Sequence, residues 1–146
     1  MPLKIDFKSG DKMVINGAVV ENVGPNTKLL VHNESAILRE KEILSVADST
    51  TPASRVYFAL QCSYIFLQKR DDYLKVFHKF LTEYVEACPS AHAIAEEIEA
   101  EVKQGRVYKA LKKTQKLIAH EAQIVRGLQH DLEETLTEPA AEKERV

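Results

Sequence analysis

The residues that could carry catalytic or metal chemistry are scattered along this chain of 146 residues. The histidines show no HExxH or other metal-ligand spacing, and the five glycines form neither a GxGxxG motif nor a P-loop. Most carboxylates lie among lysines in stretches of helical periodicity, which is typical of a solvated helix face. We therefore expect no enzymatic activity, no metal site and no cofactor. The histidines are His32, His78, His92, His120 and His130.

One cluster of basic residues has helical spacing. At about 100° per residue its side chains fall within a third of the helix circumference, opposite an apolar stripe. Between residues 103 and 126, seven basic residues accompany one acidic residue, a local charge of +6 in a chain whose net charge is −2. Two interpretations remain open: the wet face of an amphipathic helix, or a ridge that follows phosphates. This secondary basic ridge consists of Arg106, Lys109, Lys112, Lys113 and Lys116.

A second set of cations lies in the first 46 residues. Six acidic residues offset these six cations, so an RNA contact here requires a fold that separates the two signs. Phe7 is the only aromatic residue before Tyr57, which argues against a surface on which bases stack. Backbone edges and long basic side chains would then have to make the contact. The candidate RNA-binding residues are Lys4, Lys8, Lys12, Lys28, Arg39 and Lys41.

The segment that carries these cations has the pattern of short strands. Between residues 3 and 8 apolar and charged residues alternate, which is the period of a half-buried strand. Asn16-Gly17 is a strong hairpin signal, because a type I′ turn requires positive φ at both central residues. Four or five strands within about 40 residues predict an antiparallel β-meander or small open barrel. We call residues 1–46 the β lobe.

From Asp48 onward helical periodicity dominates, and the whole chain is predicted to have an α+β fold. Residues 51–68 form an almost uniformly apolar stretch, with Thr51 as a helix cap and Pro52 at the first helical position. Such a helix must be covered on most sides, so it should lie at the centre. A break near residues 70–72, where an aspartate can cap, and Gly105 separate the later helices. We expect a four-helix antiparallel bundle over residues 47–136, the helical lobe, and a disordered tail over residues 137–146.

The two cysteines and the N-terminus point to a cytoplasmic protein. Cys62 and Cys88 have no CxxC spacing and sit among apolar neighbours, which favours two buried, reduced thiols over a disulfide. The opening Met-Pro-Leu-Lys-Ile-Asp-Phe-Lys alternates charge with hydrophobic residues, unlike a signal peptide or a membrane anchor. We expect no contact with a membrane.

Four local sequences together carry a family resemblance. They are Met-Pro-Leu-Lys-Ile at the start, Ile15 to Val19, Ile37-Leu38-Arg39, and Thr-Pro-Ala-Ser-Arg-Val-Tyr-Phe-Ala at residues 51–59. They resemble the FlbT family of flagellar-biosynthesis repressors. The resemblance runs from residue 1 to about residue 130, in matching order. It implies a post-transcriptional regulator that associates with the 5′ untranslated leader of flagellin mRNA and lowers its translation and lifetime. Some family members promote flagellin production, so the resemblance leaves the sign of regulation open.

A more distant resemblance lies in two stretches of the β lobe, Gly10 to Ile15 and Arg39 to Ile43. They are similar to the carbon-storage regulator CsrA, a dimeric β-protein that binds mRNA leaders. This analogy implies that Arg39, near the end of the last strand, contacts RNA, with Leu3 and Lys4 nearby in an interleaved dimer.

Two functional hypotheses follow. In the first, the β lobe binds the flagellin mRNA leader. In the second, the aromatic-rich helices over residues 56–67 and 73–85 hold flagellin or another flagellar regulator without RNA contact. A homodimer is compatible with either, because so small a sheet has edges to protect.

Overall fold

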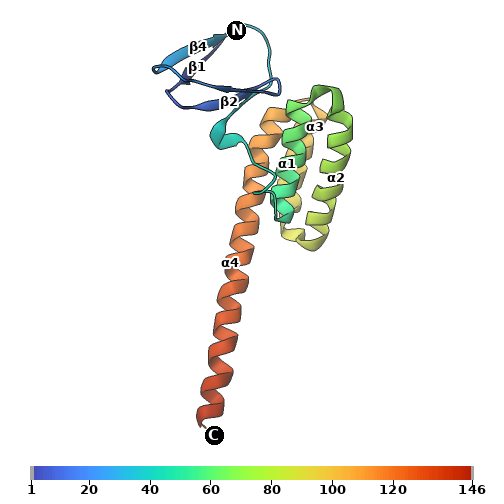
Figure 1. The fold of residues 1–146 in the computed structure, drawn as a ribbon. Coiled ribbons are helices and arrows are strands. Elements are labelled where there is room, and N and C mark those ends of the chain that lie inside the picture. Colours follow the sequence, from blue (N-terminus) through green and yellow to red (C-terminus); the bar gives the residue numbers. More distant parts are fainter. Residues whose placement is uncertain (1, 146) are drawn as a thin grey trace.

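The computed structural model describes residues 2–145, with side chains described through Thr137, and it has the α+β fold that the sequence predicts. The β lobe sits at one end of the molecule, beside the helices (Figure 1). The strands are β1 (Leu3–Phe7), β2 (Lys12–Ile15), β3 (Ala18–Glu21), β4 (Thr27–Val31) and β5 (Ile37–Arg39). The helices are α1 (Pro52–Ile65), α2 (Arg70–Ala87), α3 (His92–Lys103) and α4 (Val107–Arg145), with 3₁₀ turns η1 (Glu40–Glu42), η2 (Leu67–Lys69) and η3 (Pro89–Ala91).

The five strands form two small antiparallel sheets. One sheet pairs β1 with β4, and the other has the order β3-β2-β5. This differs from a meander, in which every strand would pair with the next one in sequence. The two sheets enclose a cluster that includes Ile5, Phe7, Met13 and Ile37. A single flat sheet would leave one of its faces in water, so stacking the two sheets explains the non-sequential pairing.

The predicted hairpin at Asn16-Gly17 is confirmed. Both residues have positive φ, 49° and 87°, and β2 pairs with β3 around them. The Asn16 side-chain oxygen also accepts the N–H of Ala36 at 2.9 Å, while the Asn16 N–H donates to the Ala36 carbonyl at 2.8 Å. The hairpin is thereby tied to the residue that precedes β5.

Strand β5 connects the two hydrophobic clusters of the molecule. Ile37 points into the cluster between the sheets, while Leu38 is fully buried in the helical core. Successive side chains on a strand point to opposite faces, so this short strand contributes to both. The Tyr64 hydroxyl from α1 accepts the N–H of Ile37 at 3.2 Å and adds a polar link between the lobes.

Helix α1 is central, as predicted. It packs against both α2 and α4, and Val56, Tyr57 and Leu60 are among its buried residues. Thr51 caps it by accepting the Ser54 N–H, and the carboxylate of Glu121 on α4 accepts the Ala53 N–H at 2.9 Å. A carboxylate at this end also interacts favourably with the helix dipole.

The helix break lies close to the predicted position, but the predicted aspartate cap is wrong. η2 separates α1 from α2, and Lys69 precedes α2 without a capping side chain. Asp71 and Asp72 instead lie within the first turn of α2, where negative charge is favourable. The break is stabilised by Arg70, whose Nε donates to the Ser63 carbonyl at 3.1 Å.

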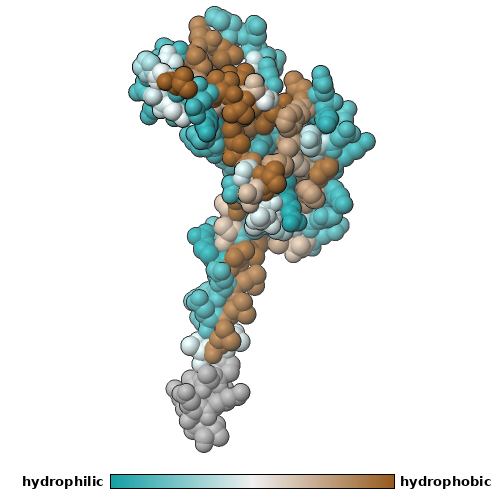
Figure 2. Space-filling view, viewed as in Figure 1, coloured by the Kyte–Doolittle hydropathy of each residue, from teal (hydrophilic) through white to brown (hydrophobic). Residues whose placement is uncertain are grey.

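Helix α4 continues past residue 136, where the predicted helical lobe ends, and extends well past the other helices (Figure 1). Its first turns are buried against α1 and α3, but Val125, Leu128, Leu132 and Leu136 are exposed. They form a continuous apolar strip on the extended part (Figure 2). The predicted disordered tail begins at residue 137, and residues 138–146 lie outside the part whose side chains are described, so that prediction stays untested.

No helix in the described part of the chain is both long and apolar enough to cross a membrane. Cys62 and Cys88 are free thiols, and burial raises the pKa of Cys62. The division of the chain at residues 46/47 into two domains stays a prediction.

Candidate nucleic-acid interface

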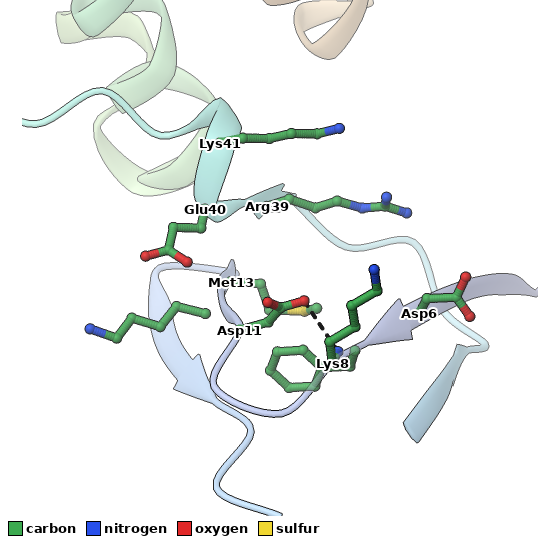
Figure 3. Close-up of a pocket in the computed structure, with 9 residues that line it drawn as sticks. Asp6, Lys8, Asp11, Met13, Arg39, Glu40 and Lys41 are labelled. Carbon is green, nitrogen blue, oxygen red and sulfur yellow. Dashed lines mark hydrogen bonds between the residues drawn. The ribbon is translucent and has the colours of Figure 1, made fainter. Parts of the chain in front are cut away.

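A cavity at the rim of the β lobe brings together four of the predicted RNA-binding residues. Its volume is about 560 Å³, and its lining comes from the ends of three strands and from η1. Lys8 follows β1, Lys12 begins β2, Arg39 ends β5 and Lys41 lies in η1. These positions are far apart in sequence, and the fold makes them neighbours (Figure 3).

The backbone around the cavity fixes where these side chains start. The carboxylate of Asp11 accepts the Lys8 N–H at 3.1 Å and closes the turn between β1 and β2. Gly10 within that turn has φ of 83°, a conformation that favours glycine. On the other side, Met13 of β2 pairs with Arg39 of β5, which sets the register of the arginine at the cavity rim.

The charge around the cavity is only slightly positive. Asp6, Asp11 and Glu40 accompany the four cations, leaving a formal charge of +1. Lys12 lies 3.7 Å from Glu21, whereas Lys8, Arg39 and Lys41 form no ion pair with any residue whose side chain is described. Lys8 and Arg39 reach toward each other across the cavity (Figure 3). A lysine and an arginine that line one cavity without an ion pair to a described side chain favour the binding of an anion there.

The other two predicted residues, Lys4 and Lys28, do not line this cavity. They lie on the outer face of the β1–β4 sheet, where Lys28 is directly opposite Asp6. The predicted set of six therefore divides into four residues at the cavity and two on a neighbouring exposed face.

The secondary basic ridge on α4 is largely paired with carboxylates. Lys112 lies 2.7 Å from Glu42, and Arg106 and Lys113 both contact Glu101, at 2.7 and 3.2 Å. Lys116 lies 3.4 Å from Glu97. Only Lys109 has no ion pair within the described side chains; it lines a separate hollow with Asn16 and Glu34. The local charge of +6 counted along the sequence is thus offset by acidic residues of η1 and α3.

Glu42 is a buried charged residue beside the cavity that the sequence analysis did not predict to be part of the site. Its side chain is 6% exposed, and it accepts hydrogen bonds from the Arg39 N–H at 3.0 Å and the Tyr108 hydroxyl at 2.6 Å, besides the Lys112 ion pair. Burial raises the pKa of Glu42, but these hydrogen bonds and the Lys112 charge outweigh burial and lower it below 4.5. Nothing in the local sequence distinguishes Glu42 from the neighbouring Glu40.

Glu42 joins the cavity rim to the helical core. Its carboxylate holds the backbone of Arg39, and its backbone carbonyl accepts the Tyr57 hydroxyl of α1. The same residue therefore fixes both the end of β5 and the position of η1 against α1 and α4. We interpret Glu42 as a positioning residue for Arg39 and Lys41.

His120 takes a structural position between two helices and a 3₁₀ turn. His120 on α4 hydrogen-bonds through Nδ1 to the Tyr84 hydroxyl and through Nε2 to the Ser90 hydroxyl, each at 2.9 Å. Burial raises the pKa of Tyr84 to about 12. Within the described residues, no group of three or more histidine, cysteine or acidic side chains could hold a metal ion. The expectation that the protein is not an enzyme stays a prediction.

Comparison with known proteins identifies the family. Residues 3–125 match the sequence model of the family described as Flagellar protein FlbT. A probable flagellum biosynthesis repressor protein FlbT of Caulobacter sp. (strain K31) is 35% identical over 125 residues, covering 84% of this chain and 95% of the relative. The protein of the same name from Rhodopseudomonas palustris (strain TIE-1) is 31% identical over 128 residues, covering 86% and 98%.

The name of a third relative does not carry the word "probable". The flagellum biosynthesis repressor protein FlbT of Caulobacter vibrioides (strain ATCC 19089 / CIP 103742 / CB 15) is 33% identical over 123 residues, covering 83% of this chain and 87% of the relative. No solved structure matches the chain. The matched residues 3–125 include all five strands, the cavity residues and the packed part of the helical lobe, and the chain belongs to the FlbT family.

Proposed function

We propose that this protein represses flagellum biosynthesis by binding the 5′ untranslated leader of flagellin mRNA through the cavity of the β lobe. The repressor role is supported by the names of relatives that match most of the chain. The RNA contact is supported by one observation above all: Lys8, Lys12, Arg39 and Lys41 converge on one cavity, and three of them have no ion pair among the described side chains.

The chemistry of the cavity fits a looped RNA backbone. Long basic side chains bind phosphates, and such contacts supply most of the affinity in protein–nucleic acid complexes. Phe7, the nearest aromatic ring, is buried between the sheets, so it offers no platform for base stacking. Recognition would therefore depend on the shape and phosphate positions of a folded leader rather than on a stacked single strand. A protein bound there would occlude the ribosome or expose the message to decay.

We expect Arg39→Ala to weaken binding to the flagellin leader about tenfold, because the substitution removes the arginine at the cavity rim. Fluorescence anisotropy with a labelled leader at several salt concentrations would measure it. Each phosphate contact contributes about −0.7 to the slope of log affinity against log salt on single strands, so the slope should become shallower by that amount. Lys8→Ala should behave similarly.

Lys28→Ala is the matched control, because it removes the same charge from the same lobe but outside the cavity. It should change the affinity less than Arg39→Ala. Equal losses from Lys28→Ala and Arg39→Ala would mean that net charge, and not the cavity, determines binding. No salt-dependent binding of the leader by the wild-type protein would refute the proposed function.

A second candidate function is the binding of flagellin or another flagellar protein. It is favoured by a hollow of about 470 Å³ beside the hairpin turn, whose lining includes Phe66, Leu67 and Tyr73. Phe66 and Leu67 are both about half exposed, which suits recognition of an apolar side chain. Co-elution with flagellin from an RNase-treated lysate, lost on Phe66→Ser, would support this candidate; co-elution that RNase abolishes would exclude it.

A further inference from the structure

The extended part of α4 carries an apolar stripe that nothing in the described chain covers. Val125, Leu128, Leu132 and Leu136 are 47%, 57%, 60% and 75% exposed. Spacings of three and four residues place them on one helix face, the same face that is buried against the bundle at Ala110, Thr114 and Leu117. The core-facing stripe of α4 thus continues past the core (Figure 2).

The stripe needs a partner for energetic reasons. Removing exposed leucine side chains from water is favourable, so leucines at this spacing stabilise a contact that buries them. The extended segment also contains Gly127, a residue that destabilises a helix interior relative to alanine, and no helix packs beside it in the described structure. A second helix along the stripe would supply the missing contacts.

We propose that the stripe is the interface of a two-fold symmetric homodimer in which two α4 helices pair antiparallel. We place the two-fold axis at the level of residue 130, so that Leu128 of one copy lies opposite the partner's Leu132. The two-fold symmetry repeats this contact. Ile124 and Val125 then lie at the level of the partner's Leu136. The stripe is self-complementary, which is what a second copy of this chain requires.

The flanking charges favour the antiparallel arrangement. When two identical helices pair antiparallel, residues on one side of the stripe lie next to residues on the same side of the partner's stripe. Arg126 then lies beside the partner's Glu133, and symmetry repeats this contact. A parallel pair would instead place Asp131 beside the partner's Glu133, which is repulsive. One unfavourable contact remains in the antiparallel pair, because Asp131 lies near Asp131 of the second copy, close to the symmetry axis.

The area needed by a stable dimer also favours antiparallel pairing. Residues 124–136 span only about 20 Å of helix, and a specific interface buries roughly 800 Å² per partner. An apolar groove of about 410 Å³ continues the stripe where α4 enters the bundle, between Pro52, Phe80, Tyr84 and Ile124. Antiparallel pairing brings the partner's Leu136 to the mouth of this groove, so the groove adds to the interface.

Sedimentation velocity on the full chain at concentrations up to about 100 µM tests the proposal, a range that detects micromolar dissociation constants. We expect a dimer, and Leu132→Glu should raise the dissociation constant at least about a hundredfold, because symmetry doubles the loss. Gln123→Glu is the matched control: it adds the same charge on the opposite face of α4 and should leave the dimer intact.

Charge reversal tests the orientation. Arg126→Glu and Glu133→Arg should each weaken the dimer, and the double variant should restore it; absence of restoration would overturn the antiparallel arrangement. Hydrogen exchange of residues 124–137 in the wild-type protein should slow as concentration rises, a readout that needs no variant. A wild-type protein that is monomeric at every concentration would overturn the dimer and leave the stripe to a different protein.

Discussion

Leu38→Ala is expected to lower the free energy of unfolding by about 3 kcal/mol, within the range of 2–5 kcal/mol for truncating a buried leucine. Leu38 is fully buried in the helical core although it belongs to β5, so its truncation opens a cavity where the β lobe meets the helices. Urea unfolding followed by circular dichroism would measure the loss.

Leu30→Ala provides the comparison for this result. Leu30 is also a strand leucine of the β lobe, but it is 53% exposed on the outer face of the β1–β4 sheet. Its truncation should change the free energy of unfolding by no more than about 0.5 kcal/mol. Similar losses at Leu38 and Leu30 would mean that β5 does not anchor the β lobe to the helices.

Glu42→Ala is expected to cost about 3 kcal/mol, because removing one partner of a buried ion pair leaves its other partners unsatisfied. The substitution removes the acceptor of the Arg39 N–H, the Tyr108 hydroxyl and the Lys112 ammonium. Lys112 is 44% exposed and can turn to water, which keeps the loss at the lower end of the range for such pairs. Glu40→Ala in the same turn, where the side chain is exposed, should cost no more than about 0.5 kcal/mol.

The stabilisation by Glu42 should depend on pH in a defined direction. Its pKa in the folded protein lies below the ordinary value of 4.5 because hydrogen bonds and the Lys112 charge outweigh burial. Because folding lowers this pKa, the ionised carboxylate stabilises the folded state, and its contribution is complete above about pH 4.5. The contribution is lost as the pH falls through the pKa of Glu42 in the folded protein. The stability difference between the wild-type protein and Glu42→Ala should therefore shrink between pH 7 and about pH 3, as measured by urea unfolding at each pH. A difference that grows in acid would contradict this account.

Glu42→Ala also tests whether Glu42 positions Arg39 for RNA binding without contacting the RNA itself. Because Glu42 is buried behind the cavity rim and holds the Arg39 backbone, its loss should weaken leader binding without removing a cation. The salt slope of leader binding should then keep its wild-type value, unlike that of Arg39→Ala. A shallower slope would mean that Glu42 acts by changing the number of phosphate contacts.

An antiparallel α4 dimer would place two β lobes at opposite ends of the assembly, since each lobe lies at the end of α4 away from the stripe (Figure 1). Each lobe would carry its own cavity of basic residues. This arrangement differs from a dimer built on sheet edges, which the small size of the β lobe suggested.

The sequence alone determined the local elements of this protein. Asn16-Gly17 encodes the hairpin because both residues tolerate positive φ, and Thr51-Pro52 encodes the start of α1. The apolar character of residues 56–67 required a covered, central helix. These features depend on residues that are near one another in the chain, which is why a pattern in the sequence is enough to predict them.

Only the tertiary structure decided which charges are available. Along the sequence, the cations of α4 form the stronger cluster, yet Glu42, Glu97 and Glu101 come from other elements and pair with four of its five members. In the β lobe, strand pairing brings Lys8, Arg39 and Lys41 to one rim. None of these three forms an ion pair with a described side chain, although Asp6, Asp11 and Glu40 line the same cavity. Charge pairing acts through space, and a count along one helix does not include partners that lie 5 to 70 positions away on other elements.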